Sequence, residues 1–175
     1  GTCVINVRFA PTTSGNFGAN VVVTSNSGGS PHSLPVKGAG IAPVITPIPS
    51  SVVFGSQPVG IASAPQLVLV RNTGNAPLTI SSVTVISTNA SDFTAVANGC
   101  TEVAPGADCT VSVTFRPGAL GARTATLVLT GNAINSPVSV PLSGTGVATG
   151  PSIGFTPLSL LFGDQAVGTT SVVQS

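Results

Sequence analysis

Apolar and polar residues alternate along several stretches of the chain. In CTVSVTFRP every second residue from the first is apolar, namely Cys109, Val111, Val113 and Phe115. The intervening positions carry hydroxyl groups, and the segments at 123–131 and 138–143 alternate in the same way. A period of two predicts β-strands with one buried face and one hydroxyl-rich outer face.

The same criterion predicts further strands, near residues 51–55, 65–72, 78–87 and 92–97. Turn signals separate them, including Asn72-Thr-Gly-Asn75 and Ala104-Pro-Gly-Ala107, where Gly after Pro suits a type II turn. No segment has a helical period. About seven short strands in about 100 residues predict an all-β, immunoglobulin-like β-sandwich.

The sequence also repeats itself. Residues 3–41 align without a gap on 109–147, an offset of 106, and 15 of the 39 pairs are identical. Residues 43–67 align on 151–175 at an offset of 108, with 11 of 25 identical, so that FGSQPVG returns as FGDQAVG. The sequence therefore predicts tandem sandwiches with a period of about 106–108 residues.

This register divides the chain into three parts. Residues 1–42 are the C-terminal part of a preceding repeat, 43–148 a complete repeat, and 149–175 the N-terminal part of a following repeat. We expect the chain to be a window of a longer array. The linkers APVITPIPS and ATGPSIGFTP are short and Pro-rich, which favours semi-rigid connections.

The low charge of the chain limits the kinds of partner that we expect. Charged residues make up 5% of the chain, and five basic and four acidic side chains give a net charge of +1. Nucleic acid is therefore not an expected partner, because no basic patch can form. No apolar run reaches the roughly 18 residues that a membrane span needs, so membrane insertion is not expected.

The quoted strands and turns carry a family resemblance. The run VLVRNTGNAPLTISSVTV, then SDFTAV, CTEVAPGADCTVSVTFRPGALGARTATLVLTGNA and VSVPLSGTG, resembles the bacterial choice-of-anchor D repeats. These are similar to ASH and hydin-type domains and to the PapD-like sandwiches. The resemblance implies the fold, and it implies a spacer role in large secreted or surface-attached bacterial proteins.

Three cysteines suggest the compartment. Cys100 and Cys109 flank the turn at 104–107, and we expect a disulfide between them, with two buried free thiols as the alternative. Cys3 aligns with Cys109, and its partner would lie nine residues earlier, so we expect it to be unpaired in this chain. A disulfide favours an extracellular or periplasmic location.

Residues that could support catalysis are few. His32 is the sole histidine, and its counterpart in the complete repeat is Val138, so we interpret it as a loop or strand-end residue. The four acids lie in different segments: Asp92, Glu102, Asp108 and Asp164. Hydrolysis by paired carboxylates and Ca²⁺ binding both need clustered acids. We therefore expect no enzyme, no cofactor and no metal site.

Two further motifs have simple interpretations. GAGIA at 38–42 and GTGVATG at 144–150 lack the spacing of a dinucleotide loop, and we interpret them as strand ends entering linkers. Asn89-Ala90-Ser91 fits an N-glycosylation acceptor, but a single triplet arises easily in such a chain. With little charge, Pro137 and Pro141 are expected to protect an edge at the last strand.

The sequence favours a non-catalytic extracellular repeat module that forms a spacer, a stalk or a fibre. Its expected partners are neighbouring repeats of the same protein, in line or side by side, with glycan as a further candidate. An adhesin or carbohydrate-binding module is the alternative, although the chain lacks Trp and Tyr. An accessory spacer in a large secreted enzyme is another.

Overall fold

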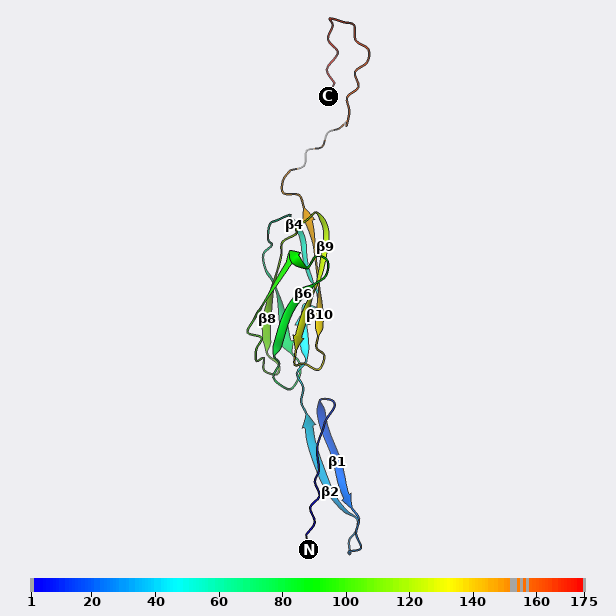
Figure 1. Ribbon diagram of the computed structural model, residues 1–175, viewed down its shortest axis with the longest axis vertical. Coiled ribbons are helices and arrows are strands. Elements are labelled where there is room, and N and C mark those ends of the chain that lie inside the picture. The colour runs from blue at the N-terminus through cyan, green and yellow to red at the C-terminus, as the bar shows by residue number, and fades with distance from the viewer. Residues whose placement is uncertain (1, 152–153, 155, 157, 175) are drawn as a thin grey trace.

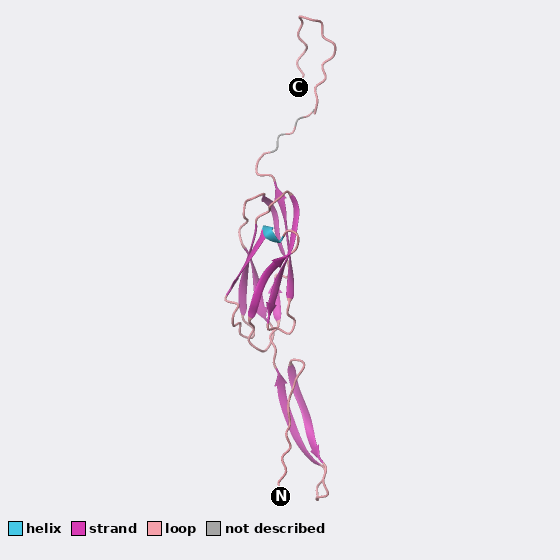
Figure 2. Cartoon of the chain, in the orientation of Figure 1, coloured by secondary structure: helices cyan, strands magenta, loops and turns pink. Residues whose placement is uncertain are grey.

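The computed structural model describes residues 2–151, 154, 156 and 158–174. Ten strands are formed, and the described residues include no helix longer than the short 3-10 turn η1 (Ala90–Asp92) (Figure 2). The strands are β1 (Gly15–Val23), β2 (His32–Gly40), β3 (Ile45–Ile48), β4 (Val52–Pro58), β5 (Gln66–Asn72), β6 (Ile80–Ile86), β7 (Phe93–Asn98), β8 (Asp108–Phe115), β9 (Gly121–Gly131) and β10 (Val138–Val147).

Strands β3 to β10 form two facing sheets, one ordered β4-β10-β9-β6 and the other β3-β5-β8-β7. All neighbours are antiparallel except β4 and β10, which run parallel. The predicted immunoglobulin-like β-sandwich is confirmed. The eighth strand, β3, was missed because its segment, ITPI, lies in the Pro-rich stretch that we interpreted as a linker.

The core lies between the sheets and follows the predicted alternation. Val111, Val113 and Phe115 of β8 are fully buried, as are Leu127 and Leu129 of β9. Three phenylalanine rings meet at one end of this core. The centroid of Phe115 lies 4.8 Å from that of Phe93 and 5.6 Å from that of Phe54. Such aromatic pairs stabilise beyond the area they bury.

A glycine makes room for the central ring. A Cβ placed on Gly144 of β10 would lie 2.8 Å from Cδ1 of Phe115, which is closer than real Cβ contacts allow. Gly144 therefore lies within a paired strand and packs against a side chain. The interpretation of GTGVATG as a strand end that enters a linker is confirmed, since β10 ends at Val147 and residues 148–150 follow it outside the sheet.

The expected edge at the last strand is present over part of its length. β10 lies between β4 and β9, but its residues 138–141 pair with β9 alone, so Pro141 lies where β10 is a local edge. It is tolerated there because the pairing of β10 with β4 begins one residue later, at Leu142. The actual edge strands carry other devices, including Pro47 in β3 and an irregular register in β4 near Gly55, whose φ is +66°.

The hairpin β1–β2 lies next to one end of the sandwich (Figure 1). It pairs Gly15 with Gly40, and β9–β10 pairs the corresponding Gly121 with Gly146. The two hairpins therefore share one register. Residues 2–14, which precede the hairpin and align in part with β8, form no strand.

The C-terminal segment leaves the opposite end of the sandwich (Figure 1). Its described residues form no strand, although 160–166 aligns with β4. Leu160 is 48% exposed, whereas its counterpart Val52 is 2% exposed. Within the part of the chain that the structure describes, no helix is long and apolar enough to cross a membrane.

Candidate functional site

The structure contains a disulfide between Cys100 and Cys109, as predicted. Both residues are buried, and their Cα atoms lie 5.2 Å apart. Cys109 lies in β8, whereas Cys100 follows β7, so the bond closes the loop that connects these two strands. Cys3 is free and exposed.

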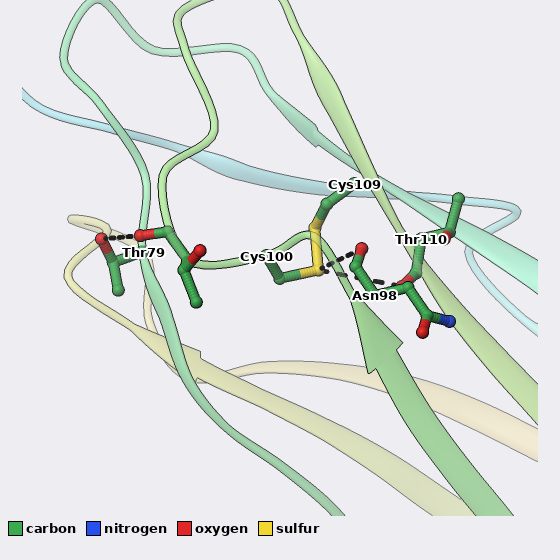
Figure 3. Close-up of a disulfide and its surroundings, with 6 residues drawn as sticks. Thr79, Asn98, Cys100, Cys109 and Thr110 are labelled. Carbon is green, nitrogen blue, oxygen red and sulfur yellow. Dashed lines mark hydrogen bonds between the residues drawn. A yellow bond between two sulfur atoms is a disulfide. The ribbon is translucent and has the colours of Figure 1, made fainter.

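Hydrogen bonds attach the same loop to the opposite sheet (Figure 3). The amide of Ile80 donates to the carbonyl of Cys100 at 2.9 Å, and the hydroxyl of Thr79 donates to the carbonyl of Thr101 at 2.9 Å. At the tip, the amide of Ala107 donates to the carbonyl of Ala104, and Gly106 has a φ of +78°. The predicted type II turn geometry is therefore present, and the loop is a fixed part of the sandwich.

Two of the four acids form ion pairs. Arg71 donates from Nε and Nη2 to the two carboxylate oxygens of Asp108, at 2.7 and 2.8 Å. The hydrogen bonds from Arg71 lower the pKa of Asp108; desolvation opposes this shift, and the charge of Arg71 adds to it. The same hydrogen bonds and the charge of Asp108 raise the pKa of Arg71. The carboxylate of Asp108 is therefore engaged in a structural ion pair with Arg71.

The second pair is more buried. Asp92, 5% exposed, accepts a hydrogen bond from Nε of Arg123 at 2.5 Å, and its carbonyl accepts one from the amide of Arg116. Removing either partner would leave an uncompensated charge in a poorly hydrated place. Asp92 thus holds η1 against β9 and serves structure.

The remaining candidates lie apart from one another. Glu102 lies in the disulfide loop, and Asp164 lies in the C-terminal segment. His32 is the first residue of β2, and its Nε2 lies 3.4 Å from the hydroxyl of Ser27. Among the described residues no group of three or more His, Cys, Asp or Glu side chains gathers as metal ligands do.

Asn89 of the predicted glycosylation triplet is partly buried, and its Oδ1 accepts a hydrogen bond from the amide of Thr124 at 3.1 Å. The first glycine-rich motif, GAGIA, begins inside β2 and ends in the connection to the sandwich.

An apolar groove of about 390 Å³ runs along the N-terminal hairpin. It is lined by residues that include Val7, Phe9, Val21 and Val36. Their counterparts at an offset of 106 are core residues of the sandwich: Val113, Phe115, Leu127 and Leu142. The groove is therefore lined by side chains whose sequence counterparts form the core of the sandwich.

Sequence reasoning missed one set of polar residues. Asn72, Asn75 and Asn135 bind the backbone that enters the sandwich, through hydrogen bonds of 2.8–3.4 Å. The segment NTGN forms a turn, as predicted. A turn signal does not reveal what the side chains of its residues bind. Asn72 is fully buried, and no signal in the sequence marks it as such.

Comparisons with known proteins agree with this architecture. A protein of unknown function from Porphyromonas gingivalis W83 superposes with a TM-score of 0.51 at 16% identity, covering 78% of this chain and 68% of that one. The ASH/PapD-like domain 7 of human CEP192 superposes with a TM-score of 0.45 at 15% identity, covering 62% and 89%. At 16% identity the first of these likenesses shows the fold alone.

The secreted serine protease VesC from Vibrio cholerae superposes with a TM-score of 0.47 at 18% identity, covering 62% of this chain. The chain spans about a quarter of VesC, since the match covers 24% of that protein. No curated protein matches the sequence.

The sequence profile of the ASH domain, described as abnormal spindle-like microcephaly-associated, ASPM-SPD-2-Hydin, matches residues 43–138. This range is more than half of the chain and covers β3 to β9 and the disulfide loop. Domains of this kind are generally non-catalytic modules. With the sandwich topology and this match together, the chain belongs to the ASH family of PapD-like, immunoglobulin-like domains.

Proposed function

We propose that this chain is part of an extracellular, non-catalytic array of sandwich domains that acts as a spacer, a stalk or a fibre. The observation that carries the proposal is a double correspondence between the hairpins β1–β2 and β9–β10. They share the strand register, and in each a glycine faces a phenylalanine ring. A Cβ on Gly38 would lie 2.8 Å from Cε1 of Phe9, as one on Gly144 would lie 2.8 Å from Cδ1 of Phe115.

The disulfide supports the extracellular part of the proposal. Disulfides persist in oxidising compartments and are rare in the cytosol. The bond between Cys100 and Cys109 closes a loop of the central domain, so it stabilises the fold itself.

The surface supports association with further copies. Within 43–148 three basic and three acidic side chains balance, and four of these six are paired in two ion pairs. The sheet β3-β5-β8-β7 carries exposed apolar residues on its outer face: Leu67, 57% exposed, and Val96, 55% exposed, both lie opposite Ser112. A face with so little charge offers little repulsion to a second copy of the array.

The test uses the full-length gene product isolated from the medium or cell surface. Electron microscopy should show extended rods with regular beads, associated side by side, and peptide mapping without reduction should link Cys100 to Cys109. Leu67→Lys should reduce lateral association. Ser112→Thr, which exchanges one polar residue for another on the same face, is the matched control and should leave association unchanged. A compact particle, an intracellular protein with free thiols, or glycan binding by a single domain would contradict the proposal.

A further inference from the structure

Three of the four residues that connect the N-terminal hairpin to the sandwich are bound by the sandwich. Residues 41–44 link β2 to β3, and they would be a flexible tether if they touched nothing. Instead, Ala42, Pro43 and Val44 all form backbone hydrogen bonds to the sandwich. Pro43 is also buried.

The first anchor is the turn at 72–75, which follows β5. Oδ1 of Asn75 accepts from the amide of Ala42 at 2.8 Å, the amide of Asn75 donates to the carbonyl of Ala42 at 3.0 Å, and Nδ2 lies 3.4 Å from the carbonyl of Gly40. One residue thus satisfies three backbone groups of the connection. The amide of Thr73 adds a bond to the carbonyl of Val44 at 3.1 Å.

Asn72 holds this first anchor in place from inside the domain. Its Nδ2 donates to the carbonyls of Ala76 at 2.7 Å and Val103 at 2.9 Å, and its Oδ1 accepts from the amides of Gly74 and Val44. The side chain has no exposed surface. It therefore ties the turn, the disulfide loop and the connection into one network of buried polar groups.

The second anchor comes from the other sheet. In the turn between β9 and β10, the amide of Ile134 donates to the carbonyl of Pro43 at 3.1 Å. Asn135 accepts from the amide of Ile45 at 3.0 Å and donates to its carbonyl at 2.8 Å. The connection is consequently gripped between one loop of each sheet.

The preceding unit reaches the same loops. A shallow cleft of about 290 Å³ is lined by Ser14 and Gly15 of the hairpin unit and by Thr73, Gly74 and Asn75 of the sandwich. A second cleft, of about 210 Å³, lies between the segment 11–14 and Ile134. The end of the sandwich thus meets the end of the preceding unit on both sides of the connection.

From this geometry we infer that Asn72, Asn75 and Asn135 form an amide clamp that fixes the orientation of the preceding unit to the sandwich. Asn75 binds the connection and the end of β2, and Asn135 holds the first residue of β3, where the connection enters the sandwich. We define the amide clamp as these three asparagine side chains. It contains no charged group, so the orientation does not depend on pH, salt or divalent cations. The inference rests on the proposed function only in that it explains how a spacer array would be kept straight.

The first measurement is amide hydrogen exchange on the 175-residue chain. The amides of Ala42 and Ile45 should be protected, because each donates to a clamp side chain. In Asn75→Ala the amide of Ala42 should exchange about tenfold faster or more, the loss expected for one hydrogen bond. Asn135→Ala should do the same for Ile45.

Asn98→Ala serves as the matched control. Asn98 is an exposed asparagine at the end of β7, away from the connection, and its removal should leave both rates unchanged. Asn75 and Asn135 are themselves exposed, so their substitution should leave the sandwich folded. A circular dichroism spectrum and a thermal unfolding curve check this.

The second measurement is the distribution of distances between spin labels at Ser33 in β2 and Ser139 in β10, after Cys3→Ser. The native chain should give one narrow distribution, unchanged by a chelator, by 1 M salt (a Debye length of about 3 Å) or between pH 5 and 8. Asn75→Ala with Asn135→Ala should broaden it. Gly74→Ala should also change it, because a Cβ there would lie 2.7 Å from Cα of Pro43 and from the amide nitrogen of Val44.

Gly28→Ala is the control for the glycine variant, since a Cβ at Gly28 meets nothing within 4 Å. Unprotected amides at Ala42 and Ile45, or a broad native distribution, would overturn the amide clamp and leave the spacer role standing. A clamp that passes both tests in a protein that is compact or intracellular at full length would overturn the spacer role instead.

Discussion

Residues 3–40 and 109–146 have the same pattern of apolar residues and glycines, but only the second stretch buries its apolar face. Phe115 is fully buried against Phe54 and Phe93, whereas its counterpart Phe9 is 51% exposed and has Phe17 as its aromatic neighbour. The hairpin forms in both places with the same register. Local pairing therefore follows from the local sequence, but burial requires the strands of the opposite sheet.

The largest expected difference in stability is between substitutions of the two corresponding phenylalanines, Phe115 and Phe9. Phe115→Ala removes the ring at the centre of the aromatic cluster and should lower the free energy of unfolding of the sandwich by about 3–5 kcal/mol. Phe9→Ala is the matched control and should change it by about 0.5 kcal/mol or less. Urea denaturation of both variants measures this. Equal losses would mean that the hairpin and the sandwich share one cooperative core.

The cysteines give the next largest difference. Replacing Cys100 and Cys109 together by Ala should reduce the free energy of unfolding by about 2–3 kcal/mol, because the disulfide closes a short loop in the unfolded chain. Cys3→Ala should have no effect beyond about 0.5 kcal/mol. The same urea curves, with and without reductant, test this, and a native protein insensitive to reductant would contradict it.

Substitution of two corresponding glycines gives a third comparison between the sandwich and the hairpin. Gly144→Ala forces a Cβ against a buried ring that has no room to move, and should destabilise the sandwich by about 1–3 kcal/mol. Gly38→Ala meets the corresponding ring of Phe9, which is half-exposed and free to turn aside, so the loss should be smaller. Thermal unfolding of the two variants compares them directly, and a larger loss for Gly38→Ala would contradict this explanation.

The smallest effect is a dependence of stability on pH. We expect it for the sandwich and not for the hairpin, because the counterpart of Asp108 is Thr2. Arg71 lowers the pKa of Asp108 in the folded state, so the pair stabilises the fold above the unfolded pKa, near 3.9. This stability is lost as the pH falls through the folded pKa. Unfolding temperatures measured from about pH 6 to about pH 2 should converge with those of Asp108→Asn at the acid end.

Much of the sandwich could be predicted because its strands alternate. The buried residues of β8 and β9 were all identified from their period of two. β3 was missed because Pro47 and Pro49 break the pattern, and an edge strand tolerates proline where it needs no ladder hydrogen bond. Pro141 indicated an edge, and the half of β10 that carries it has no partner on one side, although the rest of β10 is paired on both sides.

The amide clamp could not be predicted by the same means. Its members lie in two turns more than 50 residues apart and meet the connection only after both sheets have formed. Alternation identifies which face of a strand is buried, but no periodic signal marks a side chain that binds backbone groups. Only the three-dimensional arrangement shows that Asn75 and Asn135 bind neighbouring residues of one segment.

The parallel pairing of β4 with β10 has a mechanical consequence. The chain enters the sandwich at one end and leaves it at the other (Figure 1). β4 lies near the point of entry in the sequence, and β10 is the last strand before the exit. Tension along the chain would pull these two strands in opposite directions along their length. The hydrogen bonds between them, over register pairs from Leu142–Val52 to Val147–Pro58, would then bear the load together in shear and would not open one at a time.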